Sequence, residues 1–85
     1  MPKEQNYQAK IQKDLEKQGY YVLKLIKTNK NGIPDILAMK HNEVYLIECK
    51  TPKGRLSEIQ KYRLDELKNK GFKVAVSYGN KIIEY

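Results

Sequence analysis

Residues 32–51 read Gly-Ile-Pro-Asp-Ile-Leu-Ala-Met-Lys-His-Asn-Glu-Val-Tyr-Leu-Ile-Glu-Cys-Lys-Thr. Two apolar, strand-like runs lie in this stretch. Asp35 opens the first run and Glu48 closes the second. Apolar strands rarely carry charged side chains unless these are paired or bind a metal. The two acids therefore mark a candidate active site on two predicted strands, residues 35–39 and 44–49.

The connection between these runs is short, which favours an antiparallel hairpin. If the turn is centred between His41 and Asn42, residues whose numbers add up to 83 face each other, and Asp35 lies opposite Glu48. Opposed residues have Cβ atoms about 5 Å apart. Lys50 follows Glu48 by two residues, so both project from the same face, whereas Cys49 projects from the other face into the core.

Two carboxylates at this separation repel each other unless a cation lies between them. An all-oxygen site of this kind suits Mg²⁺ or Mn²⁺, which can take a phosphate oxygen and stabilise charge on a phosphodiester. Lys50 could then orient the attacking water or stabilise the pentavalent transition state. The alternative is a surface cluster of ion pairs. A second Glu-x-Lys at residues 66–68, in a predicted helix, shows that the tripeptide alone is not diagnostic.

Length and charge narrow the class of protein. The 85 residues suffice for one small domain, and the excess of 17 Lys and Arg over 10 Asp and Glu gives a net charge of +7. A small basic domain favours a polyanionic partner, above all nucleic acid. The single cysteine excludes an internal disulfide and favours an intracellular location. We find no apolar run for a membrane span and no signal-peptide core.

The rest of the chain predicts two helices and three further strands. Apolar residues recur at helical spacing over residues 3–18 and again over residues 57–70. Strands are predicted over residues 20–26, 72–77 and 81–85, with residues 78–80 as a turn. The order α-β-β-β-α-β-β predicts an α/β (α+β) fold with a mixed sheet flanked by helices.

Further site candidates each have a competing explanation. Glu4 shares a helix face with Ile11 and could reach the sheet as a third acid, but an acid in a first helical turn also complements the helix dipole. Gln60 could hold a water or a phosphate near Lys50, but it also completes a capping box with Ser57. The basic residues of the two loops beside the predicted site are either phosphate contacts or ordinary solvated residues: Lys27, Lys30, Lys53 and Arg55.

Three segments together resemble the VRR-NUC domain, the virus-type replication-repair nuclease branch of the PD-(D/E)XK superfamily. They are Gly32-Ile33-Pro34-Asp35, residues 48–57 (Glu-Cys-Lys-Thr-Pro-Lys-Gly-Arg-Leu-Ser) and Gln60. The resemblance implies a restriction-endonuclease-like core and a metal-dependent phosphodiesterase acting on DNA. It assigns Asp35, Glu48 and the Cys49 carbonyl to the metal and makes Lys50 the catalytic lysine.

The resemblance also concerns two helix residues. Glu4 resembles the acid of the family's first helix and is a further candidate metal ligand, while Gln60 resembles the glutamine of its second helix. Glu16 is the other acid that could fill the first of these positions, but it lies about 120° from Glu4 on the helical wheel. Glu4 is therefore preferred.

The expected function is that of a Mg²⁺-dependent (or Mn²⁺-dependent), structure-specific DNA endonuclease in DNA repair. It would cut branched DNA such as Holliday junctions, as a single domain over residues 1–85, inside a bacterium or a phage-infected host. Two symmetric cuts need two active sites, which a C2 homodimer supplies. The alternatives are a non-catalytic nucleic-acid-binding module and an interaction subunit of a replication or repair complex.

Overall fold

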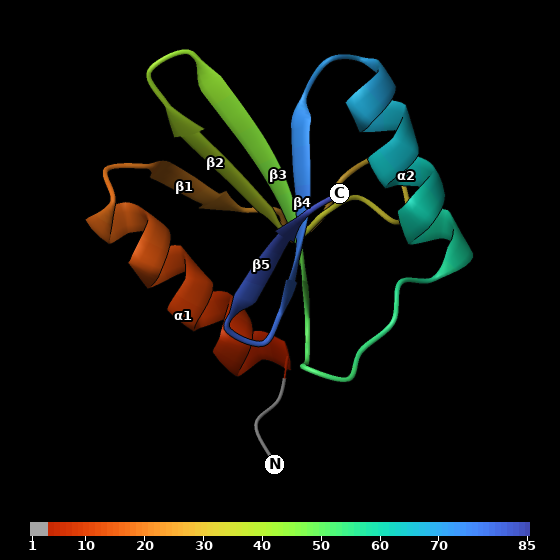
Figure 1. The fold of residues 1–85 in the computed structure, drawn as a ribbon. Coiled ribbons are helices and arrows are strands. Elements are labelled where there is room, and N and C mark those ends of the chain that lie inside the picture. The colour runs from red at the N-terminus through yellow and green to blue at the C-terminus, as the bar shows by residue number, and fades with distance from the viewer. Residues whose placement is uncertain (1–3) are drawn as a thin grey trace.

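The computed structural model describes the backbone of residues 4–85 and the side chains of residues 6–85. Its helices and strands follow one another in the predicted order (Figure 1). They are α1 (Glu4–Lys17), β1 (Tyr21–Lys24), β2 (Ile36–Lys40), β3 (Glu43–Lys50), α2 (Glu58–Asn69), β4 (Lys73–Tyr78) and β5 (Lys81–Glu84). None of the helices described is long and apolar enough to cross a lipid bilayer.

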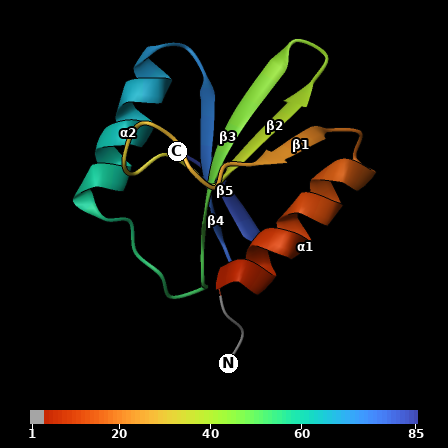
Figure 2. The same cartoon turned by 180° about the vertical axis from the view of Figure 1, so that it is seen from behind.

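The five strands form one mixed sheet in the order β1-β2-β3-β4-β5. Strands β3 and β4 run parallel, and the other neighbouring strands pair antiparallel. A parallel pair needs a crossover connection, which here contains α2. Figures 1 and 2 show α1 and α2 on opposite faces of this sheet, so that helices flank it as expected.

Each helix covers its own apolar core. Ile11 and Leu15 of α1 pack with Ile36, Ile47 and Cys49, together with small residues of the same face. On the other face, α2 buries Leu64 against three residues of β3 and β4: Leu46, Val74 and Val76. Side chains alternate along a strand, so the odd-numbered residues of β3 face α1 and the even-numbered ones face α2. Cys49 is therefore a core residue, as expected.

The predicted hairpin register is confirmed. Ile36 pairs with Ile47, and the pairing continues to Lys40 and Glu43, all with residue numbers that add up to 83. The strands extend further toward the turn than predicted, because a two-residue turn matches the twist of an antiparallel pair. That turn is His41-Asn42, and His41 adopts a positive φ of 54°.

Strand β1 ends earlier than predicted, and strand β4 ends later. Strand β1 ends at Lys24, which pairs with Ile36, the first residue of β2. Pro34 then ends the pairing because proline has no N–H to donate. Strand β4 extends to Tyr78, which was predicted as a turn residue. It remains in the strand because β3 continues to Lys50 and pairs with it.

Candidate active site

Asp35 lies directly before β2 and continues its register toward Glu48. Its Oδ2 accepts a hydrogen bond of 2.8 Å from the backbone N–H of Cys49. This bond ties the acid to the end of β3, one residue beyond Glu48. The hairpin therefore brings the Asp35 carboxylate next to the Glu-x-Lys segment, as its register predicts.

Glu48 is an almost fully buried carboxylate, with 2% of its surface exposed. Its Oε2 accepts a hydrogen bond of 3.2 Å from Nε2 of Gln60 and lies 3.9 Å from Nζ of Lys50. A buried charge is costly unless it is paired and hydrogen-bonded. The two partners meet this requirement and come from β3 itself and from α2.

The end of β3 is fixed by the neighbouring hairpin. The backbone N–H of Gly79 donates a hydrogen bond of 2.8 Å to the carbonyl of Lys50. The side chain of Lys50 is only 13% exposed. Gly79 has a φ of +63°, and a Cβ added to it would lie 2.8 Å from Cγ of Pro52. A glycine is needed here both for its backbone conformation and for the close approach of Pro52.

Gln60 completes the capping box that the sequence predicts, and its side chain also contacts Glu48. Its side-chain Oε1 accepts from the backbone N–H of Ser57 at 2.9 Å, and its backbone N–H donates to the Ser57 hydroxyl at 3.2 Å. This is the capping box at the start of α2. Because Oε1 is used in the cap, the amide group of the same side chain faces Glu48. Gln60 therefore caps α2 and holds Glu48 at the same time.

Glu4 is the first residue of α1, but its side chain lies outside those that the structure describes. Helix α1 covers the sheet face opposite to Glu48, yet its N-terminal end lies beside the end of β3 in Figures 1 and 2. Cε1 of Tyr7 lies 3.4 Å from the position of a Cβ on Gly79. The first turns of α1 are thus close to the site. Glu16 is exposed near the other end of the helix.

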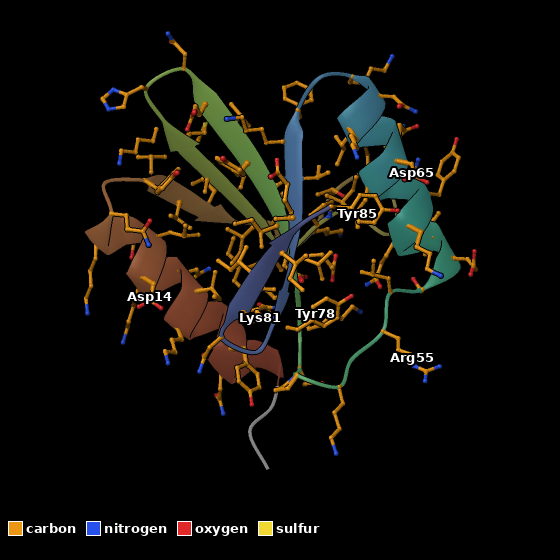
Figure 3. The ribbon with its side chains drawn as sticks, in the orientation of Figure 1. Asp14, Arg55, Asp65, Tyr78, Lys81 and Tyr85 are labelled. Atoms are coloured by element: carbon orange, nitrogen blue, oxygen red, sulfur yellow. The ribbon has the colours of Figure 1, made fainter. Side chains whose placement is uncertain are left out.

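The two basic loops flank the acids. All four of their predicted DNA contacts are exposed: Lys27, Lys30, Lys53 and Arg55. Arg55 extends from the loop after β3 into solvent (Figure 3). The loop of Lys27 and Lys30, together with Asp35, lines an open, polar depression of about 410 Å³.

Helix α2 holds the loop of Lys27 and Lys30 in place. Nε of Arg63 donates a hydrogen bond of 2.8 Å to the carbonyl of Asn31. Gly32 packs so tightly on Ile59 that an added Cβ would lie 2.8 Å from its Cγ1. Sequence reasoning missed the role of Arg63, because its partner is a backbone carbonyl and leaves no residue pattern to detect.

The oxygen atoms of Asp35 and Glu48, with the carbonyl of Cys49, are a donor set suited to Mg²⁺ or Mn²⁺. Within residues 6–85, no group of three or more His, Cys, Asp or Glu side chains is placed to hold a metal. Mg²⁺ is commonly bound by one or two carboxylates and completes its coordination with water and phosphate oxygens. A pair of carboxylates therefore fits this ion.

Lys73 and Tyr85, which lie outside the candidate site, make hydrogen bonds that shift their pKa values. The hydrogen bond to Glu43 raises the pKa of Lys73, and the hydrogen bond to Asp65 raises the pKa of Tyr85. Both pairs join separate elements: Lys73 on β4 contacts β3, and Tyr85 contacts α2. They are structural contacts outside the candidate site.

The fold and the site define a nuclease-like α+β domain with a Pro-Asp and Glu-x-Lys pair on one hairpin. The model of the VRR-NUC domain family matches residues 2–81. The chain belongs to this family, which confirms the resemblance, the fold class and the assignment to the nucleases.

A viral relative is also similar. It is a crossover junction endodeoxyribonuclease of Sulfolobus islandicus rod-shaped virus 1, 30% identical over 63 residues. The matched segment covers 72% of this chain and 52% of the relative. The chain therefore spans about half the length of that relative.

Proposed function

We propose that this protein is a divalent-metal-dependent DNA endonuclease that cuts branched DNA such as four-way junctions. One observation carries the proposal: the hairpin and α2 gather Asp35, Glu48, Lys50 and Gln60 at one end of β3. The viral relative named as a crossover junction endodeoxyribonuclease favours a junction as the substrate. The net charge of +7 favours DNA binding.

Asp35, Glu48 and the carbonyl of Cys49 would hold Mg²⁺ or Mn²⁺, with Glu4 as a further candidate ligand. When bound, the cation would stabilise charge on the phosphate and make a coordinated water more acidic. Its position would depend on the hydrogen bonds that orient the two acids. These are the bond from the Cys49 N–H to Asp35 and the bond from Gln60 to Glu48.

The remaining side chains act on the substrate and on the acids. Water attacks the phosphorus, and the bond to the 3′ oxygen breaks, which leaves a 5′-phosphate and a 3′-hydroxyl. Lys50 orients the water and stabilises the negative charge that develops on the phosphate oxygens. Gln60 is a positioning residue, because it acts by holding Glu48. The exposed basic residues of the two loops contact phosphates along the DNA: Lys27, Lys30, Lys53 and Arg55.

A symmetric pair of cuts requires two such sites, and we propose that a C2 homodimer inside the cell supplies them. A second candidate function is a DNA-binding module without catalysis. The Glu48–Lys50 ion pair favours it, because a buried ion pair can also be purely structural. That module would bind DNA in a salt-sensitive way and would need no metal.

One assay separates the two functions. The purified protein is incubated with four-way-junction, flap and linear DNA in Mg²⁺, Mn²⁺ or EDTA. The nuclease predicts metal-dependent cutting, strongest on branched DNA, that Asp35→Ala or Glu48→Ala abolishes without loss of the fold. Undiminished cutting by either variant contradicts the assigned site. Binding without any cutting favours the module.

A further inference from the structure

The strand register places two further residues beside the candidate site. Tyr78 of β4 is the direct neighbour of Lys50, and Lys81 of β5 is the direct neighbour of Tyr78. Directly paired strand residues project from the same face of a sheet. Lys50, Tyr78 and Lys81 therefore form a row across three strands, here called the basic row. It lies on the same face as Glu48, which precedes Lys50 by two residues.

The side chains of Tyr78 and Lys81 are available to a ligand. Tyr78 is half-buried and packs at the edge of the core under α2, and Lys81 is exposed. In the described part of the chain, no hydrogen bond uses the Tyr78 hydroxyl and no ion pair uses Lys81. Figure 3 shows Tyr78 pointing from β4 toward the side of the molecule where Arg55 lies.

The position of the row suits a DNA backbone that leaves the site. Neighbouring strands lie about 4.8 Å apart, so Lys81 begins about 10 Å from Lys50. The phenol and the long lysine side chain are both common phosphate contacts. The loop of Lys53 and Arg55 starts from the same edge, because Pro52 packs against the Gly79 turn. Basic side chains therefore extend from Lys50 in two directions: Lys81 lies across β4, and Lys53 and Arg55 lie in the loop after β3.

We propose that the β4–β5 hairpin is a DNA-contacting element of this protein. The Tyr78 hydroxyl donates a hydrogen bond to a phosphate next to the one that is cut, and Lys81 binds the phosphate that follows. This inference rests on the proposed function and extends it, since it assigns two substrate contacts that lie outside the Pro-Asp and Glu-x-Lys segments. A purely structural hairpin would use Tyr78 only for packing and Lys81 only to protect an edge strand.

Two variants test the contacts, each with a matched control. Lys81→Ala is compared with Lys68→Ala, which removes the same charge from the far end of α2. Tyr78→Phe keeps the ring and is compared with Tyr21→Phe, an exposed tyrosine paired with Met39 at the other end of β2. Binding of a fluorescent four-way junction is measured in EDTA at several salt concentrations, and thermal unfolding of every variant is recorded.

We expect Lys81→Ala to weaken binding about three- to tenfold and to reduce the slope of log K against log salt by about one. Tyr78→Phe should weaken binding about two- to fivefold with the slope unchanged, because the hydroxyl is neutral. Both controls should remain within about twofold of the wild type. If the two variants bind DNA as their controls do, the inference is wrong.

The binding assay contains no metal, so its outcome does not depend on cleavage. Normal binding by the wild type with no cutting in Mg²⁺ or Mn²⁺ contradicts the proposed function. In that case a specific effect of Lys81→Ala and Tyr78→Phe still shows that the hairpin contacts DNA. The two proposals can therefore fail separately.

Discussion

The chain contains the pattern Glu-x-Lys twice, and the two copies behave differently. Glu48 and Lys50 lie on β3, where residues two apart project from the same face, and their charged atoms are 3.9 Å apart. Glu66 and Lys68 lie on α2, where residues two apart are separated by about 200° around the axis. Glu66 instead pairs with Arg63, three residues earlier in the helix. The secondary structure thus decides whether the pattern can form a site.

Burial separates the two copies further. Glu48 is 2% exposed and needs its hydrogen bond from Gln60 as well as the nearby ammonium. The Glu66 side chain is 34% exposed, and solvent screens its ion pair. The strand copy therefore has a positioned carboxylate in a poorly hydrated place. The helix copy offers matched controls for substitutions of Glu48 and Lys50.

The largest contrast is expected between the two lysines. Lys50→Met should lower the rate of junction cleavage by about 100-fold, because one preorganised cationic donor to the transition state is lost. Lys68→Met should change this rate by less than about twofold, since its side chain is exposed on α2. The measurement is single-turnover cleavage with Mg²⁺. Equal rates for the two variants would remove Lys50 from the mechanism.

A smaller effect is expected from the residue that supports Glu48. Gln60→Glu keeps an acceptor for the Ser57 N–H, but it replaces the amide that faces Glu48 with a second carboxylate. Cleavage should fall about tenfold, as is typical when a group that orients a metal ligand is changed. The reason is repulsion between like charges close to each other.

Ser57→Ala is the control for this variant. It removes the hydroxyl half of the same capping box and should cost about 1 kcal/mol of stability, with cleavage close to that of the wild type. Urea unfolding and cleavage rates are compared for both variants. If Gln60→Glu cleaves as fast as Ser57→Ala, Gln60 serves only as a cap.

The smallest contrast concerns the two glycines near the two copies. Gly71 follows α2 with a φ of +95° and open space around it, whereas Gly79 has a φ of +63° and also meets Pro52. An alanine at either position is strained by about 1–2 kcal/mol. Gly79→Ala should lose about 1 kcal/mol more, because Pro52 must also move. Urea unfolding measures the difference, and equal losses would show that the Pro52 contact carries no energy.

Much of the site could be predicted because it depends on local rules. The period of a strand and the hairpin register were enough to predict Asp35 next to the Glu-x-Lys segment and Cys49 in the core. The capping box was visible as Ser57 and Gln60 three residues apart. In each case the partners are close in sequence or are related by one turn.

The features that were missed depend on distant pairing. Tyr78 was predicted to lie in a turn, because the parallel pairing of β4 with β3 that places it beside Lys50 leaves no local signal. The bond from Arg63 to the Asn31 carbonyl also joins separate parts of the chain. The contact between Gln60 and Glu48 was not predicted for the same reason: the sequence shows the cap but not how α2 packs on the sheet.

The most direct test compares the two glutamates in one assay. Wild type, Glu48→Gln and Glu66→Gln are incubated with a four-way junction in Mg²⁺ and, separately, in EDTA. We expect cutting in Mg²⁺ by the wild type and by Glu66→Gln at similar rates, no detectable cutting by Glu48→Gln, and none by any protein in EDTA. Cutting by Glu48→Gln at the rate of Glu66→Gln would contradict the assignment of the active site to the strand copy.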